Sequence, residues 1–231
     1  MRSALDIRVT WSGFEAVEPD RRFVMLALHE NFVDVPLLAA FPLDVRSTAR
    51  EELFKHQDIG TLLRASHHIS IPEKRSASSV KPLVEQLRAA VAAGDSTVVF
   101  PQGSLLGIDI AFQPGAWRLA RMLALAVLPV AISGTHRVWG HPLNDEVHLG
   151  REVFVSVLPP IEPSGWSADR ARATERLLKQ SAISTGVARR FEPHRDGWRD
   201  DYAFEIDPDL DQPKSEIDTH RLVLTSNPGH R

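Results

Sequence analysis

The amino-acid sequence predicts an α/β protein, with one domain in which short strands alternate with helices. Short apolar runs that end at a polar residue or a proline are typical of buried strands. The longer stretches between them repeat apolar residues every three or four positions, as helices with one buried face do. Of the 231 residues, 43% are hydrophobic and 25% charged, which suits a folded domain with a substantial core.

The first half of the domain begins with a strand at residues 22–28, which are almost wholly apolar. Residues 33–41 then carry clustered apolar side chains, and Asn31 is a candidate cap for a helix there. Residues 48–63 show a further helical pattern, which Gly60 interrupts.

The second half starts with a short predicted strand at residues 69–71. A helix is expected over residues 81–93, because apolar residues recur at three- and four-residue spacings and Gly94 follows as a C-terminal cap. The remaining expected elements are strands at 96–100, 127–132 and 152–158 and helices at 115–125 and 168–190.

The domain is predicted to span residues 1–190, followed by a partly irregular C-terminal extension over 191–231. Basic residues outnumber acidic ones over residues 168–199, whereas acidic residues dominate 200–218. Opposite charges in adjacent segments indicate an extended or partly disordered acidic tail that lies over the basic helix.

Composition excludes several classes of function. The sequence has no cysteine, so it forms no disulfide, zinc–thiolate site or iron–sulfur cluster and has no cysteine nucleophile. A net charge of −3 argues against a nucleic-acid partner. The most apolar stretch, residues 122–132, is too short to span a bilayer, and the first twenty residues do not have the pattern of a secretory signal. These features predict a cytoplasmic protein without a membrane-spanning segment.

The first candidate for chemistry is His29, which lies five residues before Asp34. An imidazole titrates near pH ~6.5 and accepts a proton from a hydroxyl, while a carboxylate fixes its tautomer. On one continuous helix of about 3.6 residues per turn the two side chains would point apart. The pair therefore requires His29 in a turn and Asp34 about one turn into a helix. The alternative is a structural or surface histidine.

The second candidate is the segment Phe100-Pro101-Gln102-Gly103-Ser104 at the end of a predicted strand. Pro101 ends the strand, Gly103 permits close approach of the backbone, and the Ser104 hydroxyl can donate to an oxyanion or a phosphate. The alternative is an ordinary strand-to-loop turn.

The third candidate is a basic site at Lys74 and Arg75 that would hold a phosphate-bearing substrate. The alternative is a solvated basic face. Other basic residues precede this pair in the chain, at Arg46, Arg50, Lys55 and Arg64.

These three motifs, in this order, resemble those of the glycerolipid acyltransferase family, whose best-known members are the lysophosphatidic acid acyltransferases. The resemblance spans roughly residues 10–165. It is supported by further similar segments at 11–15, 49–53, 60–64 and 128–134.

The resemblance implies an O-acyltransferase that moves a fatty acyl group from acyl-CoA or acyl carrier protein to a hydroxyl of a lysophospholipid or related lipid alcohol. His29 would act as the general base, oriented by Asp34, without a covalent acyl-enzyme, a metal or a cofactor. Arg75, beside Lys74, takes the place of the family's second-motif arginine, and residues 100–104 would bind the acceptor. The implied fold is a mixed, largely parallel sheet flanked by helices, beside an apolar groove for the acyl chain.

Three residues depart from the family's usual third motif, Phe-Pro-Glu-Gly-Thr-Arg. Gln102 replaces the glutamate, Ser104 the threonine and Leu105 the arginine. Loss of the arginine removes a bidentate phosphate clamp. A neutral lipid or glycolipid therefore joins glycerol phosphate among the candidate acceptors.

A lipid substrate implies peripheral contact with the inner face of the membrane. If the apolar residues concerned are instead core residues, they are not available for this contact. The candidate contacts are Leu37, Leu38, Phe41, Leu43, Leu62 and Leu63, with Arg46 and Lys55 reaching head groups.

Three other functions compete with catalysis of acyl transfer. A serine hydrolase needs Gly-x-Ser-x-Gly, and residues 103–107 have the wrong spacing. A metal site built from histidines lacks the helical pairing with a carboxylate, so these are predicted to be surface residues: His67, His68, His136, His141 and His148. The remaining rival is a degenerate, non-catalytic member of the family that binds lipid or a partner protein.

Overall fold

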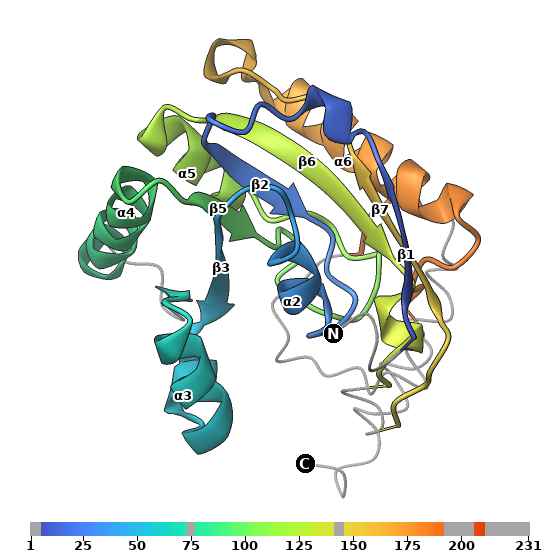
Figure 1. The fold of residues 1–231 in the computed structure, drawn as a ribbon. Helices are drawn as coiled ribbons and strands as arrows, with labels where there is room; N and C mark the ends of the chain where they lie inside the picture. Colours follow the sequence, from blue (N-terminus) through green and yellow to red (C-terminus); the bar gives the residue numbers. More distant parts are fainter. Residues whose placement is uncertain (1–5, 73–76, 141–145, 192–205, 211–231) are drawn as a thin grey trace, which may run out of the picture.

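A seven-stranded mixed sheet organises the chain, with the strand order β1-β7-β6-β2-β5-β3-β4 (Figure 1). The structure is a computed structural model that describes residues 6–72, 77–140, 146–191 and 206–210. Neighbouring strands are parallel except β6 and β7, which are antiparallel. The sheet is thus mixed and largely parallel, as expected. The strands are β1 Arg8–Ser12, β2 Phe23–Ala27, β3 Val45–Arg50, β4 Ile69–Ile71, β5 Ser96–Val99, β6 Ala126–Ser133 and β7 Glu152–Val157.

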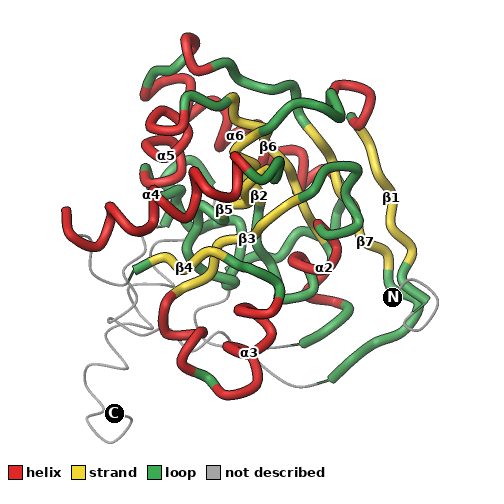
Figure 2. Tube along the Cα trace, turned by 60° about the vertical axis from the view of Figure 1, so that its left-hand side comes forward, coloured by secondary structure: helices red, strands yellow, loops and turns green. Residues whose placement is uncertain are grey.

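Helices cover both faces of this sheet. Three of them, α4, α5 and α6, pack on one face, and the short helix α2 packs on the other. Helix α3 stands away from the sheet beyond β3, as the ribbon in Figure 1 and the tube in Figure 2 show. The helices are α2 Asp34–Leu38, α3 Gln57–Ala65, α4 Ala77–Ala92, α5 Gly115–Leu123 and α6 Ala168–Ser184, with 3-10 turns η1 Phe14–Ala16, η2 Glu51–Lys55, η3 Thr135–Arg137 and η4 Pro163–Gly165.

The central strand β2 shows why the core has two halves. Its side chains alternate, so Phe23 and Met25 pack on the α2 side while Val24 and Leu26 pack on the side of α4, α5 and α6. All four are fully buried. A strand covered on both faces has no polar side, and this accounts for the apolar run in the sequence.

Two strands, β1 and β3, escaped prediction. Residues 48–63, where one helical pattern was expected, instead form the end of β3, the turn η2 and helix α3. Both missed strands carry polar side chains, and β1 alternates exposed and half-buried residues at the edge of the sheet. The predicted helix at 168–190 ends at Ser184, since Gly186 adopts a φ of 71°.

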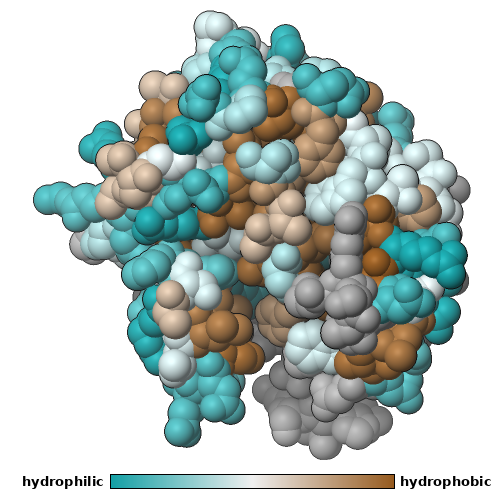
Figure 3. All heavy atoms as spheres, viewed as in Figure 1, coloured by the Kyte–Doolittle hydropathy of each residue, from teal (hydrophilic) through white to brown (hydrophobic). Residues whose placement is uncertain are grey.

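The η2–α3 lobe (residues 51–65) exposes apolar side chains. Ile59 is 40% exposed and Leu62 is 67% exposed. Figure 3 shows a patch of apolar surface on this lobe, at the lower left. The lobe is held together at Gly60, where a Cβ would lie 2.3 Å from the Phe54 carbonyl oxygen. No helix in the described parts of the chain is long and apolar enough to cross a membrane.

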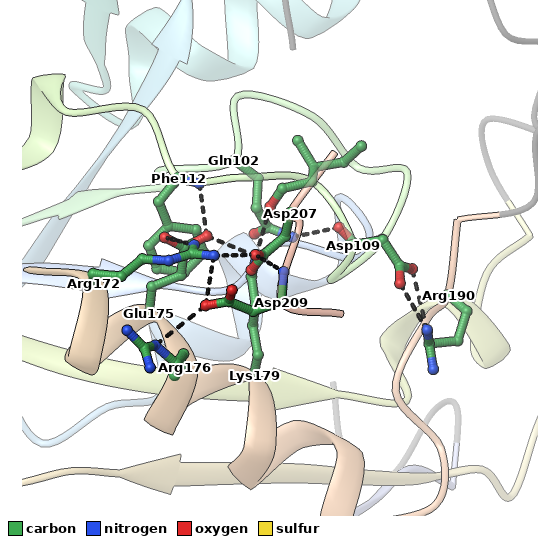
Figure 4. Close-up of polar contacts among 12 residues, drawn as sticks. Gln102, Asp109, Phe112, Arg172, Glu175, Arg176, Lys179, Arg190, Asp207 and Asp209 are labelled. Atoms are coloured by element: carbon green, nitrogen blue, oxygen red, sulfur yellow. Dashed lines mark hydrogen bonds and ion pairs between the residues drawn. The ribbon is translucent and has the colours of Figure 1, made fainter. Parts of the chain in front are cut away.

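Residues 206–210 confirm the predicted contact between the acidic tail and the basic helix. Lys179 of α6 is buried and pairs with Asp207 at 2.5 Å and with Glu175 at 2.7 Å. Arg172 also bonds to Asp207, and Asp209 lies 2.8 Å from Arg172 (Figure 4). Burial opposes ionisation of Asp207, but hydrogen bonds from Arg172 and Lys179 outweigh it and lower the pKa of that carboxyl to about 2.

The parallel strands β2, β3 and β5 end at the same edge of the sheet. Their carboxyl ends bring three segments together: the turn at His29 after β2, Arg50 at the end of β3, and Phe100 after β5. Ligands of open α/β sheets bind at this edge.

Candidate active site

His29 and Asp34 form a hydrogen-bonded pair in the turn between β2 and α2. The His29 Nδ1 lies 2.7 Å from the Asp34 Oδ2, and Asp34 is the first residue of α2. The same oxygen accepts the N–H groups of Glu30 at 2.7 Å and of Asn31 at 2.9 Å. Asp34 was expected one turn into the helix. It meets His29 from the helix start because the turn itself wraps around the carboxylate.

This arrangement decides which nitrogen of His29 is the base. An ionised carboxylate only accepts hydrogen bonds, so Nδ1 carries the proton and Nε2 keeps a free lone pair. The His29 side chain is 13% exposed, whereas that of Asp34 is fully buried. The ring stacks on Phe100, with centroids 3.8 Å apart and planes at 17°. The imidazole is therefore fixed in orientation on one edge and on one face.

The Asp34 carboxylate uses its two oxygens unequally. Oδ2 accepts three hydrogen bonds, while Oδ1 is buried and has no hydrogen-bond partner among the described residues. The carboxylate therefore holds the turn through hydrogen bonds to one oxygen, Oδ2.

Gln102 joins the His29 turn to the loop after β5. Its Oε1 accepts the His29 N–H at 2.8 Å, and its Nε2 donates to the Gly107 carbonyl at 2.9 Å. The side chain is 1% exposed. A glutamate, which the related motif usually has here, could accept the first bond but could not donate the second when ionised.

The rest of the predicted binding segment makes contacts within its own neighbourhood. The Pro101 carbonyl accepts the Gln113 N–H at 2.8 Å, and the Ser104 hydroxyl accepts the Leu106 N–H at 3.0 Å. The Ser104 bond lies within its own loop and gives no support to a serine nucleophile activated by His29. The Gly103 carbonyl accepts from Arg50 at 2.7 Å.

The structure brings Phe100 and Gln102 onto His29. The roles of residues 100–104 in binding stay predictions. Lys74 and Arg75 lie outside the described residues, so their predicted phosphate contact also stays a prediction.

The structure corrects several predicted surface contacts. Arg46 pairs with Asp95 at the opposite end of β3, away from the His29 edge. Four of the candidate membrane contacts are core residues with at most 8% exposure, because they pack α2 and the segment after it onto the sheet: Leu37, Leu38, Phe41 and Leu43.

The histidines predicted to be surface residues differ in their exposure and contacts. His136 is not a free surface residue, since its Nδ1 lies 2.9 Å from Oε2 of the buried Glu30. His67 is exposed and His68 is half-buried, while His141 lies outside the described residues. The parts of the chain that the structure describes hold no group of three side chains able to bind a metal ion.

Sequence reasoning missed two residues at this edge, Glu30 and Arg50. A carboxylate two residues after the apolar run 22–28 was the available signal for Glu30. Arg50 was noted only as one of several basic residues. Its contact with Gly103 depends on the pairing of β3 with β5, which no local pattern shows.

An apolar groove of about 760 Å³ lies beside α2, on the face of the sheet opposite α4 and α5. Val33, the residue before Asp34, lines it together with Leu37 of α2 and Trp11 of β1. A hydrocarbon chain can bind in such a surface without loss of polar hydration.

Comparison with known proteins identifies the family. Residues 8–133, more than half of the chain, match the Acyltransferase family. The chain belongs to this family. The chain is 27% identical over 157 residues to a 1-acyl-sn-glycerol-3-phosphate acyltransferase of Limnanthes alba. The match covers 65% of this chain and 54% of that relative. It is 28% identical over 123 residues to the protein of that name in Bacillus subtilis, covering 52% and 60%.

The chain thus spans only about half to three fifths of the length of these relatives. Its fold matches the crystal structure of the 1-acyl-sn-glycerophosphate acyltransferase PlsC from Thermotoga maritima, with a TM-score of 0.64 and 24% identity, over 80% of this chain and 74% of that one. The expected family and its α/β fold are therefore confirmed.

Proposed function

We propose that this chain transfers a fatty acyl group from an acyl thioester to a hydroxyl of a lysophospholipid or related lipid alcohol. The His29 Nε2 removes the hydroxyl proton as the oxygen attacks the thioester carbonyl. The tetrahedral intermediate then collapses, the C–S bond breaks, and the imidazolium returns its proton to the leaving thiolate. Asp34 stabilises the imidazolium through Nδ1.

The observation that carries this proposal is the geometry of the base. The 2.7 Å bond to Asp34 and the ring stack on Phe100 fix His29 at the carboxyl edge of the central strands. General-base catalysis needs a positioned imidazole with one nitrogen available to the hydroxyl, and the bond from Nδ1 to Asp34 supports Nε2 in this role.

The family supports the choice of acceptor and donor in this proposal. The names of the relatives described above give 1-acyl-sn-glycerol 3-phosphate as the substrate of those proteins. Leu105 in place of the family arginine removes one phosphate ligand, so the acceptor panel must include uncharged lipid alcohols. We propose acyl-CoA or acyl carrier protein as the donor.

The η2–α3 lobe is the place where we propose peripheral contact with the lipid surface. Ile59 and Leu62 are exposed and lie one turn apart on α3, and Lys55 and Arg64 are exposed near its two ends. Among the apolar side chains predicted to contact the membrane, Leu62 is the one that is strongly exposed. The contact would place the His29 edge close to a membrane-borne acceptor.

The experiment is release of free thiol from a panel of acyl donors on CoA and carrier protein. Each donor is offered with and without acylglycerol phosphate, other lysophospholipids and monoacylglycerol, presented in lipid vesicles. Wild type is compared with His29→Ala and, for vesicle binding, with Leu62→Asp. Thiol release that depends on the acceptor and falls by about 10² to 10⁴ in His29→Ala supports the proposal.

Other results would overturn it. Thiol release without an acceptor means hydrolysis, and the absence of release with every donor means a non-catalytic lipid-binding or partner-binding protein. Equal vesicle binding of Leu62→Asp and wild type removes the η2–α3 lobe as the membrane contact. Vesicle binding is measured by sedimentation, so this outcome is independent of turnover.

A further inference from the structure

Glu30 is a fully buried carboxylate that follows His29 directly and takes no part in the proton transfer described above. Its Oε2 accepts the Gly134 N–H at 2.7 Å and lies 2.9 Å from the His136 Nδ1. Its Oε1 accepts the Arg189 N–H at 2.7 Å. Burial of an ionised carboxylate is costly unless its oxygens accept hydrogen bonds, so these three bonds hold the side chain in one place.

The partners of Glu30 come from parts of the chain that are far apart in sequence. Gly134 and His136 lie where β6 ends and η3 begins, and Arg189 follows α6 by five residues. The backbone N–H of Glu30 also donates to Asp34 at 2.7 Å. The residue is therefore tied at both ends, through its backbone to the carboxylate that orients His29 and through its side chain to the body of the protein.

Residues 189–191, which we call the strap, also bind the loop after β5. The Arg189 carbonyl accepts the Ile108 N–H at 3.0 Å, and the Phe191 N–H donates to Asp109 at 2.7 Å. Arg190 pairs with the same carboxylate at 2.8 Å, as Figure 4 shows.

Gly107 makes this approach of the strap possible. Its φ is 147°, and a Cβ there would lie 2.7 Å from the Phe191 nitrogen. The Gly107 carbonyl is also the group that Gln102 binds while it holds the His29 N–H. The His29 turn contacts the loop after β5 through Gln102, and that loop contacts the strap. The bond from the Arg189 N–H to Glu30 connects the strap back to the His29 turn, so the three segments contact one another in a closed ring.

We propose that Glu30 is a positioning residue for His29. Its side chain clamps the His29–Glu30 peptide to the end of β6 and to the strap, and so fixes where the imidazole lies relative to Asp34 and Phe100. This role rests on the acyl transfer proposed above. A peptide that is free to move would displace Nε2 from the acceptor hydroxyl, and a misplacement of about 1 Å costs roughly 10²-fold in rate.

The test compares Glu30→Gln with Asp207→Asn. Glutamine keeps the volume of the side chain but sets its NH₂ against one of the N–H donors, which breaks part of the clamp. Asp207→Asn perturbs another buried carboxylate, which lies in the segment 206–210 and pairs with Lys179 of α6 rather than with the His29 turn. The measurements are kcat per folded molecule, KM for the donor, thermal unfolding, and the Nδ1–H resonance of His29 in protein labelled with ¹⁵N-histidine.

We expect Glu30→Gln to lower kcat by roughly 10- to 100-fold, with an unchanged KM for the donor and a shifted or broadened His29 resonance. Asp207→Asn should lower the unfolding temperature but leave kcat and the resonance as in wild type. If Glu30→Gln changes stability alone, Glu30 is only structural and the proposal is wrong.

Two further arms keep the result unambiguous. If Glu30→Gln does not fold, His136→Ala removes one donor from Glu30 and should lower kcat several-fold with the same change in resonance. An unchanged kcat and resonance in that variant would overturn the proposal. If wild type transfers no acyl group, the proposed function fails by itself, while the His29 resonance still reports on positioning by Glu30.

Discussion

Two clusters of buried carboxylates in this molecule do different work. At the carboxyl edge of the sheet, Asp34 accepts hydrogen bonds from two backbone N–H groups and from the His29 ring, and the far nitrogen of that ring stays available. Against α6, Glu175 of the helix and Asp207 of the segment 206–210 bind Lys179 and Arg172 (Figure 4). Lys179 also donates to the Ile110 carbonyl at 3.0 Å.

The two clusters differ in whether a nitrogen is left without a hydrogen-bond partner among the described residues. In the α6 network the ammonium of Lys179 has three acceptors for its three protons, so it is fully satisfied and has no proton to exchange with a substrate. In the His29 turn the described residues occupy Nδ1 of the imidazole and offer Nε2 no hydrogen-bond partner. A buried charge whose hydrogen bonds are all made within the protein stabilises the fold. An oriented imidazole with one nitrogen available can instead accept a proton from a substrate.

The largest effect is expected at the site, from Asp34→Asn. Because one oxygen accepts all three hydrogen bonds, an asparagine with its carbonyl at that position keeps the turn and the tautomer of His29 but loses the charge that stabilises the imidazolium. We expect kcat to fall by about 10² or more, within the range of general-base effects, with little change in thermal unfolding. A fall of less than about threefold in steady-state assays would show that the charge of Asp34 is not needed.

The second effect falls on stability, from Lys179→Met. Removal of this buried cation leaves Glu175 and Asp207 to share Arg172, and the loss of one partner of a buried pair typically destabilises a protein by about 3–5 kcal/mol. Urea denaturation measures this, and Arg176→Met serves as the matched control, because its pair with Asp209 is half-exposed and worth less than about 1 kcal/mol. Equal losses in the two variants would contradict the distinction between a buried and a surface pair. The kcat of folded Lys179→Met should equal that of wild type.

The smallest effect is the acid sensitivity of the same network. The pKa of Asp207 is lowered from 3.8 to about 2, so its ionised form favours the folded state. That stabilisation is fully present above about pH 4 and is lost as the pH falls through about 2, with a size of about 2 kcal/mol. The difference in unfolding free energy between wild type and Asp207→Asn should therefore shrink between pH 4 and pH 2. A constant difference over this range would show that Asp207 does not ionise as described.

The sequence by itself determined the elements whose signals are local. The buried strand β2 and the helix α4 follow from the period of their apolar residues, and His29 and Asp34 are close enough in the chain for one turn to join them. The order of the motifs was sufficient to indicate the family. The opposite charges of α6 and the tail predicted that the two segments lie together, as the pair of Asp207 with Lys179 shows for residues 206–210.

Only the tertiary structure decided what depends on pairing between distant segments. Strand β1 has only five residues of alternating pattern and β3 is mostly polar, so neither gives the apolar run of a buried strand, and β7 and β5 supply their hydrogen bonds. Glu30 meets Arg189 across 159 positions of the chain. No spacing encodes such a contact, since it arises when the sheet and α6 bring two chain segments together and a buried carboxylate must find donors there.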